Sequence, residues 1–195
     1  MTDQSDRFAG TAAASPAEEN VLLRAALADA QRRIEELEAL AEADPLTGLA
    51  NARRFAREVE RATGRATRHA TPAALVGFDL RNLAAINARH GRAVGDAALA
   101  HLARTLSSLI RASDQLARTG GSELALLFDH LDSDSAIETS ERVSRCIADN
   151  PLDLGKGTLP IQASISVATI LRGDTVEDVV RRGELTMHKA KARLY

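Results

Sequence analysis

The sequence predicts an α+β fold in which helices flank a sheet of the ferredoxin-like, split βαβ kind that contains antiparallel strands. Two observations support this prediction. Short apolar runs of strand type alternate with segments of helical periodicity, in the order β-α-α-β-β-α-β-α. Two of the runs flank a Gly-Gly pair, which is typical of a β-hairpin. Neighbouring strands joined by a hairpin, with helices between the others, indicate an antiparallel-containing sheet covered by helices.

Composition excludes several classes of protein. The 195 residues suit one domain plus an extension, and 45% hydrophobic with 27% charged residues is typical of a globular protein. A net charge of −2 and 3% aromatic residues argue against nucleic acid as a partner. No apolar run approaches the roughly 20 residues that span a bilayer, so we expect no membrane partner. The acidic N-terminus is unlike a signal peptide, and Cys146 is the only cysteine, so we expect a cytoplasmic protein.

The N-terminal part is expected to be a tail followed by a helical stalk. Residues 1–19 are rich in Ala, Ser, Thr and Asp without periodicity, which predicts a disordered tail. Residues 20–43 carry apolar side chains in a 4-3-4-3-4 spacing, at Leu23, Leu27, Ala30, Ile34, Leu37 and Ala41. This 3.5-residue repeat is typical of a coiled-coil seam and favours a parallel homodimer. The alternative is an amphipathic helix that folds back on its own domain.

The remaining residues, 44–195, are expected to form the α+β domain. Its first strand, 73–78, is a buried apolar run that ends at Asp79. The other elements are expected as a turn-rich stretch 44–51, a helix 52–62, a polar linker 63–72, helices 82–90 and 95–112, the hairpin 115–128, a helix 134–149, a strand 159–170 and a closing helix 176–194.

The hairpin is the most informative segment for function. Gly120 and Gly121 separate its two strands, and a tight Gly-Gly turn lets the backbone approach a phosphate closely. Glu123, just after the turn, can serve a metal ion or an attacking hydroxyl. Ser122 stands between them, where a second carboxylate would complete a magnesium site.

Four blocks in the right order resemble the GGDEF domain, the nucleotide cyclase-like diguanylate cyclase module of bacterial cyclic di-GMP signalling. The blocks cover residues 44–195 and are Asp44-x-Leu46-Thr47-Gly48-Leu49-x-Asn51-x-Arg53, then Asp79 followed by Ile86-Asn87, Gly91 and Gly95-Asp96, then Gly120-Gly121-x-Glu123, and last Glu184-x-Thr186-Met187-His188-x-Ala190-Lys191. The sequence stops soon after the last block, so we expect the family's final basic cluster and edge strand to be missing.

The resemblance implies a chemistry and a set of site residues. Joining two GTP molecules requires the 3′-hydroxyl of each to attack the α-phosphate of the other, with divalent metal between carboxylates. Each domain binds one GTP, so two domains face each other. The implied residues are Asp79 as metal ligand, Glu123 as catalytic carboxylate, Asn87 and Asp96 as guanine contacts, and Arg118, Gly120, Gly121 and Lys191 around the phosphates. Helix capping is the alternative role for Asn87 and Asp96.

The departures from the family pattern predict a degenerate site. Ser122 replaces the second metal-binding carboxylate, Arg81 replaces a usual acidic residue, and Ala84 replaces a common Lys. Losing a metal ligand costs more than the roughly 10- to 100-fold that an outer-shell partner is worth. We therefore expect cyclase activity to be absent or vestigial, with Mg²⁺ recruited weakly through Asp79 and only when GTP is bound or turned over.

A second site has both of its key residues. Arg111-Ala112-Ser113-Asp114 ends six residues before Gly120, where GGDEF domains carry their inhibitory site for cyclic di-GMP. A guanidinium grips a phosphate or the O6/N7 edge of guanine, and a carboxylate accepts from guanine N1–H and N2–H. In a turn after a helix, both side chains can point into solvent. The alternative is a solvated ion pair worth under about 1 kcal/mol.

Three functions follow from these residues. The leading hypothesis is a non-catalytic receptor that binds cyclic di-GMP at Arg111 and Asp114 and passes the signal to an effector protein. The first alternative is a slow diguanylate cyclase that uses Asp79 and Glu123. The second is a regulatory domain that binds GTP without turnover.

Overall fold

The structure, a computed structural model, describes residues 15–40 and 42–192. The chain divides into two compact units, Met1–Ala41 and Glu42–Tyr195. Within the described residues, no helix is long and apolar enough to cross a membrane.

The first unit contains a single described helix, α1 (Pro16–Leu40). Most of the predicted tail, residues 1–19, lies outside the described residues, but its last four residues belong to this helix. The helix begins at Pro16, before the expected residue 20, because Ser15 and Glu18 form a capping box. The Glu18 N–H donates to Ser15 Oγ over 3.3 Å, and the Ser15 N–H donates to Glu18 Oε2 over 2.8 Å. Pro16 fits the first helical position, where no N–H is needed. The described helix therefore covers residues 16–40, whereas the stalk was expected over residues 20–43.

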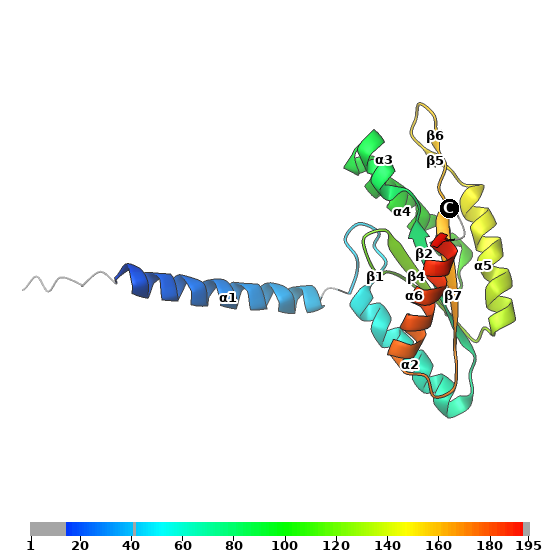
Figure 1. Cartoon of the computed structure of the whole chain (residues 1–195), viewed down its shortest axis with the longest axis horizontal. Coiled ribbons are helices and arrows are strands. Elements are labelled where there is room, and N and C mark those ends of the chain that lie inside the picture. Colours follow the sequence, from blue (N-terminus) through cyan, green and yellow to red (C-terminus); the bar gives the residue numbers. More distant parts are fainter. Residues whose placement is uncertain (1–14, 41, 193–195) are drawn as a thin grey trace, which may run out of the picture. The chain divides into compact units, whose positions relative to one another are not determined.

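The second unit contains a mixed sheet, and this confirms the predicted α+β fold (Figure 1). Five described strands form the sheet in the order β1-β3-β4-β2-β7. β2 pairs antiparallel with β4 and β7, β3 pairs antiparallel with β4, and β1 pairs parallel with β3. The strands are β1 (Ala50–Asn51), β2 (Ala73–Leu80), β3 (Gln115–Arg118), β4 (Glu123–Asp129) and β7 (Ala163–Ile170).

Helices cover both faces of this sheet. The helices of this unit are α2 (Ala52–His69), α3 (Leu83–His90), α4 (Arg92–Leu109), α5 (Ser133–Ala148) and α6 (Val176–Ala192). Residues of α4 and α5 share one core cluster with Val76 and Phe78 of β2. Residues of α2 and α6 share the other cluster with Leu75 of the same strand. Because successive strand residues point to opposite faces, β2 is buried on both sides.

Several expected boundaries differ from the structure. The predicted linker 63–72 is mostly helix, because α2 continues to bury Thr63 and Ala66 and ends only at the left-handed Ala70. The second of the two central helices begins at Arg92 and ends at Leu109, so Gly95, where it was expected to begin, lies within α4. The final strand begins at residue 163, four residues later than expected. The short strand β1 and the two-stranded sheet of β5 (Leu152–Asp153) and β6 (Thr158–Leu159) were not predicted.

Candidate functional site

The hairpin and the end of β2 form one edge of the site. Asp79 and Glu123 are directly opposite each other in the antiparallel β2–β4 register. A loop of residues 119–122 joins β3 to β4, and neither Gly120 nor Gly121 has a positive φ. The hairpin is therefore confirmed, but its expected tight two-residue turn is wrong.

Ser122 and Lys191 contact Asp79, and Lys191 also lies near Glu123. Ser122 Oγ donates to Asp79 Oδ1 over 2.5 Å, and Lys191 Nζ lies 2.8 Å from Asp79 Oδ2. Lys191 Nζ is also 3.9 Å from Glu123 Oε1. The Asp79 side chain is only 14% exposed, whereas that of Glu123 is 51% exposed. Both oxygens of the better-buried carboxylate are thus already engaged by donors from the protein.

Arg118 braces the hairpin loop. Its Nε donates to the Gly120 carbonyl over 3.1 Å, and its Nη2 donates to the Gly121 carbonyl over 2.8 Å. Its Nη1 pairs with Asp44 Oδ2 at 3.1 Å. The guanidinium expected to contact phosphate is therefore committed to the loop and to Asp44. The exposed edge of this loop offers amides instead, because the N–H groups of Gly121 and Ser122 donate to no acceptor among the described residues.

Asp44 contacts Arg118 and so supports the hairpin loop, a role that the sequence analysis did not assign to it. Burial raises the pKa of its carboxyl, but hydrogen bonds from the Thr47 hydroxyl and amide and the charge of Arg118 outweigh burial and lower the pKa. The Thr47 N–H and Oγ1 both donate to Asp44 Oδ1, at 2.8 and 2.7 Å. The Asp-x-x-Thr spacing of such a turn was the available signal.

The expected guanine contacts lie on α3 and α4. Asn87 Oδ1 is buried and accepts no hydrogen bond from the described residues. A Cβ on Gly95 would lie 1.8 Å from this oxygen, so only glycine leaves room for Asn87. The next residue, Asp96, is exposed. The caps of the two helices are Asn82 and Gly91, so the capping alternative for Asn87 and Asp96 is wrong.

A magnesium ion does not fit the arrangement around Asp79. Mg²⁺ needs oxygen ligands at octahedral positions, usually from one or two carboxylates and phosphates. Here a hydroxyl donates to one Asp79 oxygen, and an ammonium lies at the other, where its positive charge opposes a metal ion and it offers no lone pair as a ligand. Within residues 15–40 and 42–192, no three His, Cys, Asp or Glu side chains converge as a metal site.

The Arg-x-x-Asp segment forms a turn after α4. The Arg111 N–H donates to Asp114 Oδ2 over 3.0 Å, and Asp114 is only 9% exposed. The expectation that both side chains point into solvent is therefore wrong for Asp114. Its Oδ1 has only a 3.5 Å contact with Ser113 Oγ and retains capacity to accept a hydrogen bond. Arg111 is exposed, and its guanidinium pairs with no described residue.

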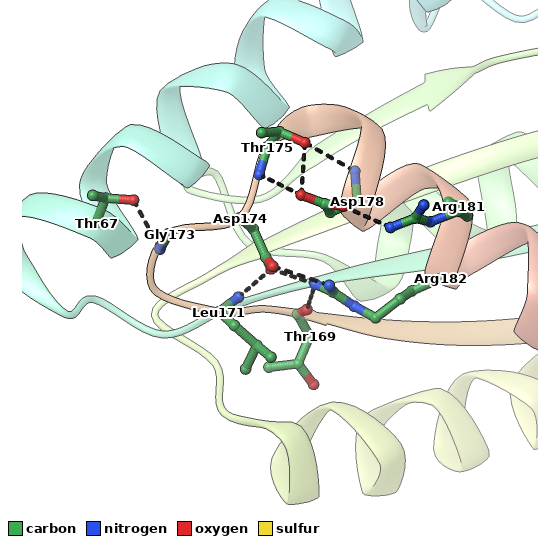
Figure 2. Close-up of polar contacts among 9 residues, drawn as sticks. All are labelled: Thr67, Thr169, Leu171, Gly173, Asp174, Thr175, Asp178, Arg181 and Arg182. Carbon is green, nitrogen blue, oxygen red and sulfur yellow. Dashed lines mark hydrogen bonds and ion pairs between the residues drawn. The ribbon is translucent and has the colours of Figure 1, made fainter.

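Helix α6 is fixed at its N-terminal end by the contacts drawn in Figure 2. Thr175 and Asp178 cap the helix reciprocally: the Asp178 N–H donates to Thr175 Oγ1 and the Thr175 N–H donates to Asp178 Oδ2, both over 3.2 Å. Arg182 pairs with Asp174 and also donates to the Thr169 carbonyl over 2.7 Å. These contacts fasten α6 to the end of β7 and so fix the helix that carries Lys191.

A cleft of about 500 Å³ lies between α2 and α6 and opens beside the hairpin. Its walls are mainly apolar, with Phe55, Val59 and Met187 among them, and Glu123 and Lys191 stand on its lining. The sequence did not predict this cleft, because it depends on how far apart the two helices lie on the sheet.

Residues 41–194 match the family model described as "Diguanylate cyclase, GGDEF domain". The chain belongs to this family. It is 30% identical over 156 residues to the response regulator PleD of Caulobacter vibrioides, an alignment that covers 78% of this chain and 34% of PleD. The chain thus spans about a third of the length of that relative.

Solved structures of GGDEF proteins share this fold. The diguanylate cyclase SiaD of Pseudomonas aeruginosa, solved with its activator SiaC, has a TM-score of 0.75 and 28% identity, over 90% of this chain and 69% of SiaD. The coiled coil and GGDEF domain of DgcB from Caulobacter crescentus, solved with c-di-GMP, has a TM-score of 0.74 and 23% identity, over 89% of this chain and 94% of DgcB. The second likeness confirms the fold, an N-terminal helix followed by the GGDEF domain.

Proposed function

We propose that this GGDEF domain is a non-catalytic receptor for cyclic di-GMP, which binds at Arg111 and Asp114. The observation that carries the proposal is a contrast between two sites. At the pocket around Asp79 and Glu123, called here the turnover pocket, both oxygens of Asp79 are engaged by Ser122 and Lys191. At the second site, the Arg111 guanidinium is exposed and without a partner among the described residues.

The degenerate signature argues against turnover. Cyclases of this family use Mg²⁺, and the reaction needs converging carboxylates to hold it. Ser122 contributes a neutral hydroxyl where a carboxylate would be needed, and this hydroxyl donates to Asp79. Glu123 alone remains open to solvent. Asp79 is engaged and residue 122 carries no charge, so only Glu123 is left as a free carboxylate for a metal ion, which makes the slow-cyclase alternative the weaker one.

The turn at Arg111 supports nucleotide binding. Asp114 Oδ2 holds the Arg111 amide, so the backbone from which the guanidinium extends is fixed. A fixed backbone lowers the entropy that binding must remove. The guanidinium can then grip guanine or phosphate in a bidentate manner, and Asp114 Oδ1 can accept from a guanine N–H.

Calorimetry with cyclic di-GMP tests the proposal. Arg111→Ala is expected to weaken binding by roughly 10- to 100-fold, since charge-assisted hydrogen bonds are worth about 1.5–3 kcal/mol. Arg104→Ala is a matched control, because Arg104 is an exposed arginine two helical turns earlier on α4. Equal losses in both variants, or no binding by the wild type, would refute the receptor function. Steady production of cyclic di-GMP from GTP would favour the cyclase instead.

GTP binding without turnover is the second candidate, and Asn87 favours it. A buried amide oxygen without a donor is uncommon, and guanine N–H groups are donors of the right kind. Asp96 is exposed and the Gly121 N–H donates to no acceptor among the described residues, and both residues belong to the set that the family resemblance assigns to GTP. Binding of GTP but not ATP, weakened about 10-fold by Asn87→Ala, would support this function.

We further propose that α1 is a dimerising stalk and that the domain signals to an effector protein in the cytoplasm. Four apolar side chains of the predicted seam are 55–66% exposed within this helix: Leu23, Leu27, Ile34 and Leu37. Apolar side chains in a 3.5-residue repeat bury themselves against a second helix. A parallel homodimer provides that helix and brings two GGDEF domains into one molecule.

A further inference from the structure

We infer that Lys191 is the resident cation of the pocket at Asp79, where it replaces a divalent metal ion and excludes it. The inference deepens the proposed function and rests on it only in treating this pocket as one without turnover. The Lys191 ammonium lies 2.8 Å from Asp79 Oδ2 and 3.9 Å from Glu123 Oε1. One lysine thus contacts the two carboxylates that a metal ion would need.

The register between α6 and β2 delivers Lys191 to Asp79. Met187 of α6 lies over Gly77 of β2, because a Cβ on Gly77 would be 3.3 Å from Met187 Cε. Four residues along a helix advance about 6 Å, and two residues along a strand advance about 6.8 Å. Lys191, four residues after Met187, therefore reaches Asp79, two residues after Gly77 on the same face of the strand.

The absence of a side chain at Gly77 makes this register possible. A Cβ there would also lie 2.7 Å from Ser166 Oγ on the neighbouring strand. The helix approaches β2 closely at this glycine, and the N-terminal anchor at Asp174 and Arg182 keeps α6 from sliding along the sheet. The lysine is thus placed by packing along the whole helix as well as by its charge.

Ser122 completes the arrangement. Its hydroxyl donates to Asp79 Oδ1 over 2.5 Å, so the side of the carboxylate that faces the hairpin is also occupied. The Asp79 side chain is 14% exposed, and a partly buried ion pair is screened less than a surface pair. A divalent ion that binds Asp79 must therefore overcome the positive charge of the ammonium at Oδ2 and share Oδ1 with the hydroxyl.

Titration with Mn²⁺, followed by electron paramagnetic resonance of the free ion, tests the inference without nucleotide or activity. Lys191→Met keeps the length of the side chain and removes its charge. We expect this variant to bind Mn²⁺ at least about 10-fold more tightly than the wild type. The gain should disappear in Asp79→Asn/Lys191→Met, and Lys189→Met, an exposed lysine on the same helix, should behave as the wild type.

Three outcomes would overturn the inference: equal Mn²⁺ affinity in the wild type and Lys191→Met, a gain that survives Asp79→Asn, or an equal gain in Lys189→Met. Calorimetry with cyclic di-GMP on the same proteins keeps this test apart from that of the proposed function. Loss of receptor binding would leave the Mn²⁺ pattern unchanged, and a failed Mn²⁺ pattern would leave binding at Arg111 unchanged.

Discussion

The contact between Gly95 and Asn87 allows a double-mutant cycle. A Cβ on Gly95 would lie 1.8 Å from Asn87 Oδ1, 2.9 Å from its Cγ and 3.1 Å from Leu83 Cδ1. The first two distances are far too short for non-bonded atoms, so Gly95→Ala must move the Asn87 side chain. The Leu83 methyl group can shift by a few tenths of an ångström to relieve its contact. The perturbation therefore acts almost entirely on one side chain.

Two opposing terms set the change in the free energy of unfolding that Gly95→Ala causes. Alanine is favoured over glycine within a helix by about 0.8–1 kcal/mol, and Gly95 lies in the interior of α4. Overpacking costs about 1–3 kcal/mol. Gly95→Ala alone should therefore lower the free energy of unfolding by about 0–2 kcal/mol. In the Asn87→Ala background the clashing atoms are gone, so the same change should raise it by up to about 1 kcal/mol.

Urea denaturation of the four proteins, followed by far-ultraviolet circular dichroism, measures the coupling energy. We expect a coupling of about 1–3 kcal/mol, well above the roughly 0.3–0.5 kcal/mol found for independent sites. Additive effects would refute the close packing of Asn87 on Gly95. Gly95→Ala should also abolish GTP binding, if Asn87 contacts guanine from this position.

The remaining predictions concern α6, the stalk and the pocket. The hydrogen bond and charge of Arg182 lower the pKa of Asp174, so the pair stabilises the fold above the unfolded pKa of about 3.9 and the stabilisation is lost as the pH falls through the folded value. Arg182→Ala should thus lower the free energy of unfolding by about 1–3 kcal/mol at pH 7, and by less below about pH 4, in urea titrations. Leu27→Glu should convert the dimer to monomer in analytical ultracentrifugation; a monomeric wild type would contradict the stalk. Ser122→Asp should raise cyclic di-GMP production, because a third carboxylate favours a divalent ion over the single ammonium of Lys191; an unchanged rate would contradict this charge balance.

Much of the fold could be predicted because its signals are local. The buried strand 73–78 and the hairpin after Arg118 have apolar runs and turn residues that specify them directly. The end of α2 could not be predicted, because Thr63 and Ala66 are held in the helix by packing on the sheet. A two-residue strand such as β1 has too few residues for any periodicity, and it exists only through its pairing with β3.

The residues of the candidate site could be named from the sequence, but their partners could not. Asp79 and Ser122 are 43 residues apart in the chain, and their contact depends on the β2–β4 register. Arg118 was expected at a phosphate, whereas the structure pairs it with Asp44 across 74 residues. Asp114 was expected in solvent, yet the turn draws its carboxylate to the Arg111 amide. In each case a long-range or backbone contact decides what the side chain can bind.

The side chain at residue 122 can therefore decide whether a divalent ion or Lys191 is favoured beside Asp79. With a carboxylate in place of the Ser122 hydroxyl, two negative groups would stand beside Glu123, and no hydroxyl would donate to Asp79. One ammonium does not balance three carboxylates, so a divalent ion would be favoured over Lys191. With the hydroxyl, Asp79 has a donor on each oxygen, and the lysine offsets one of the two remaining negative charges without a metal ion. The β2–β4 register and the α6 anchor do not involve the side chain at residue 122, so these parts of the fold are the same in both cases.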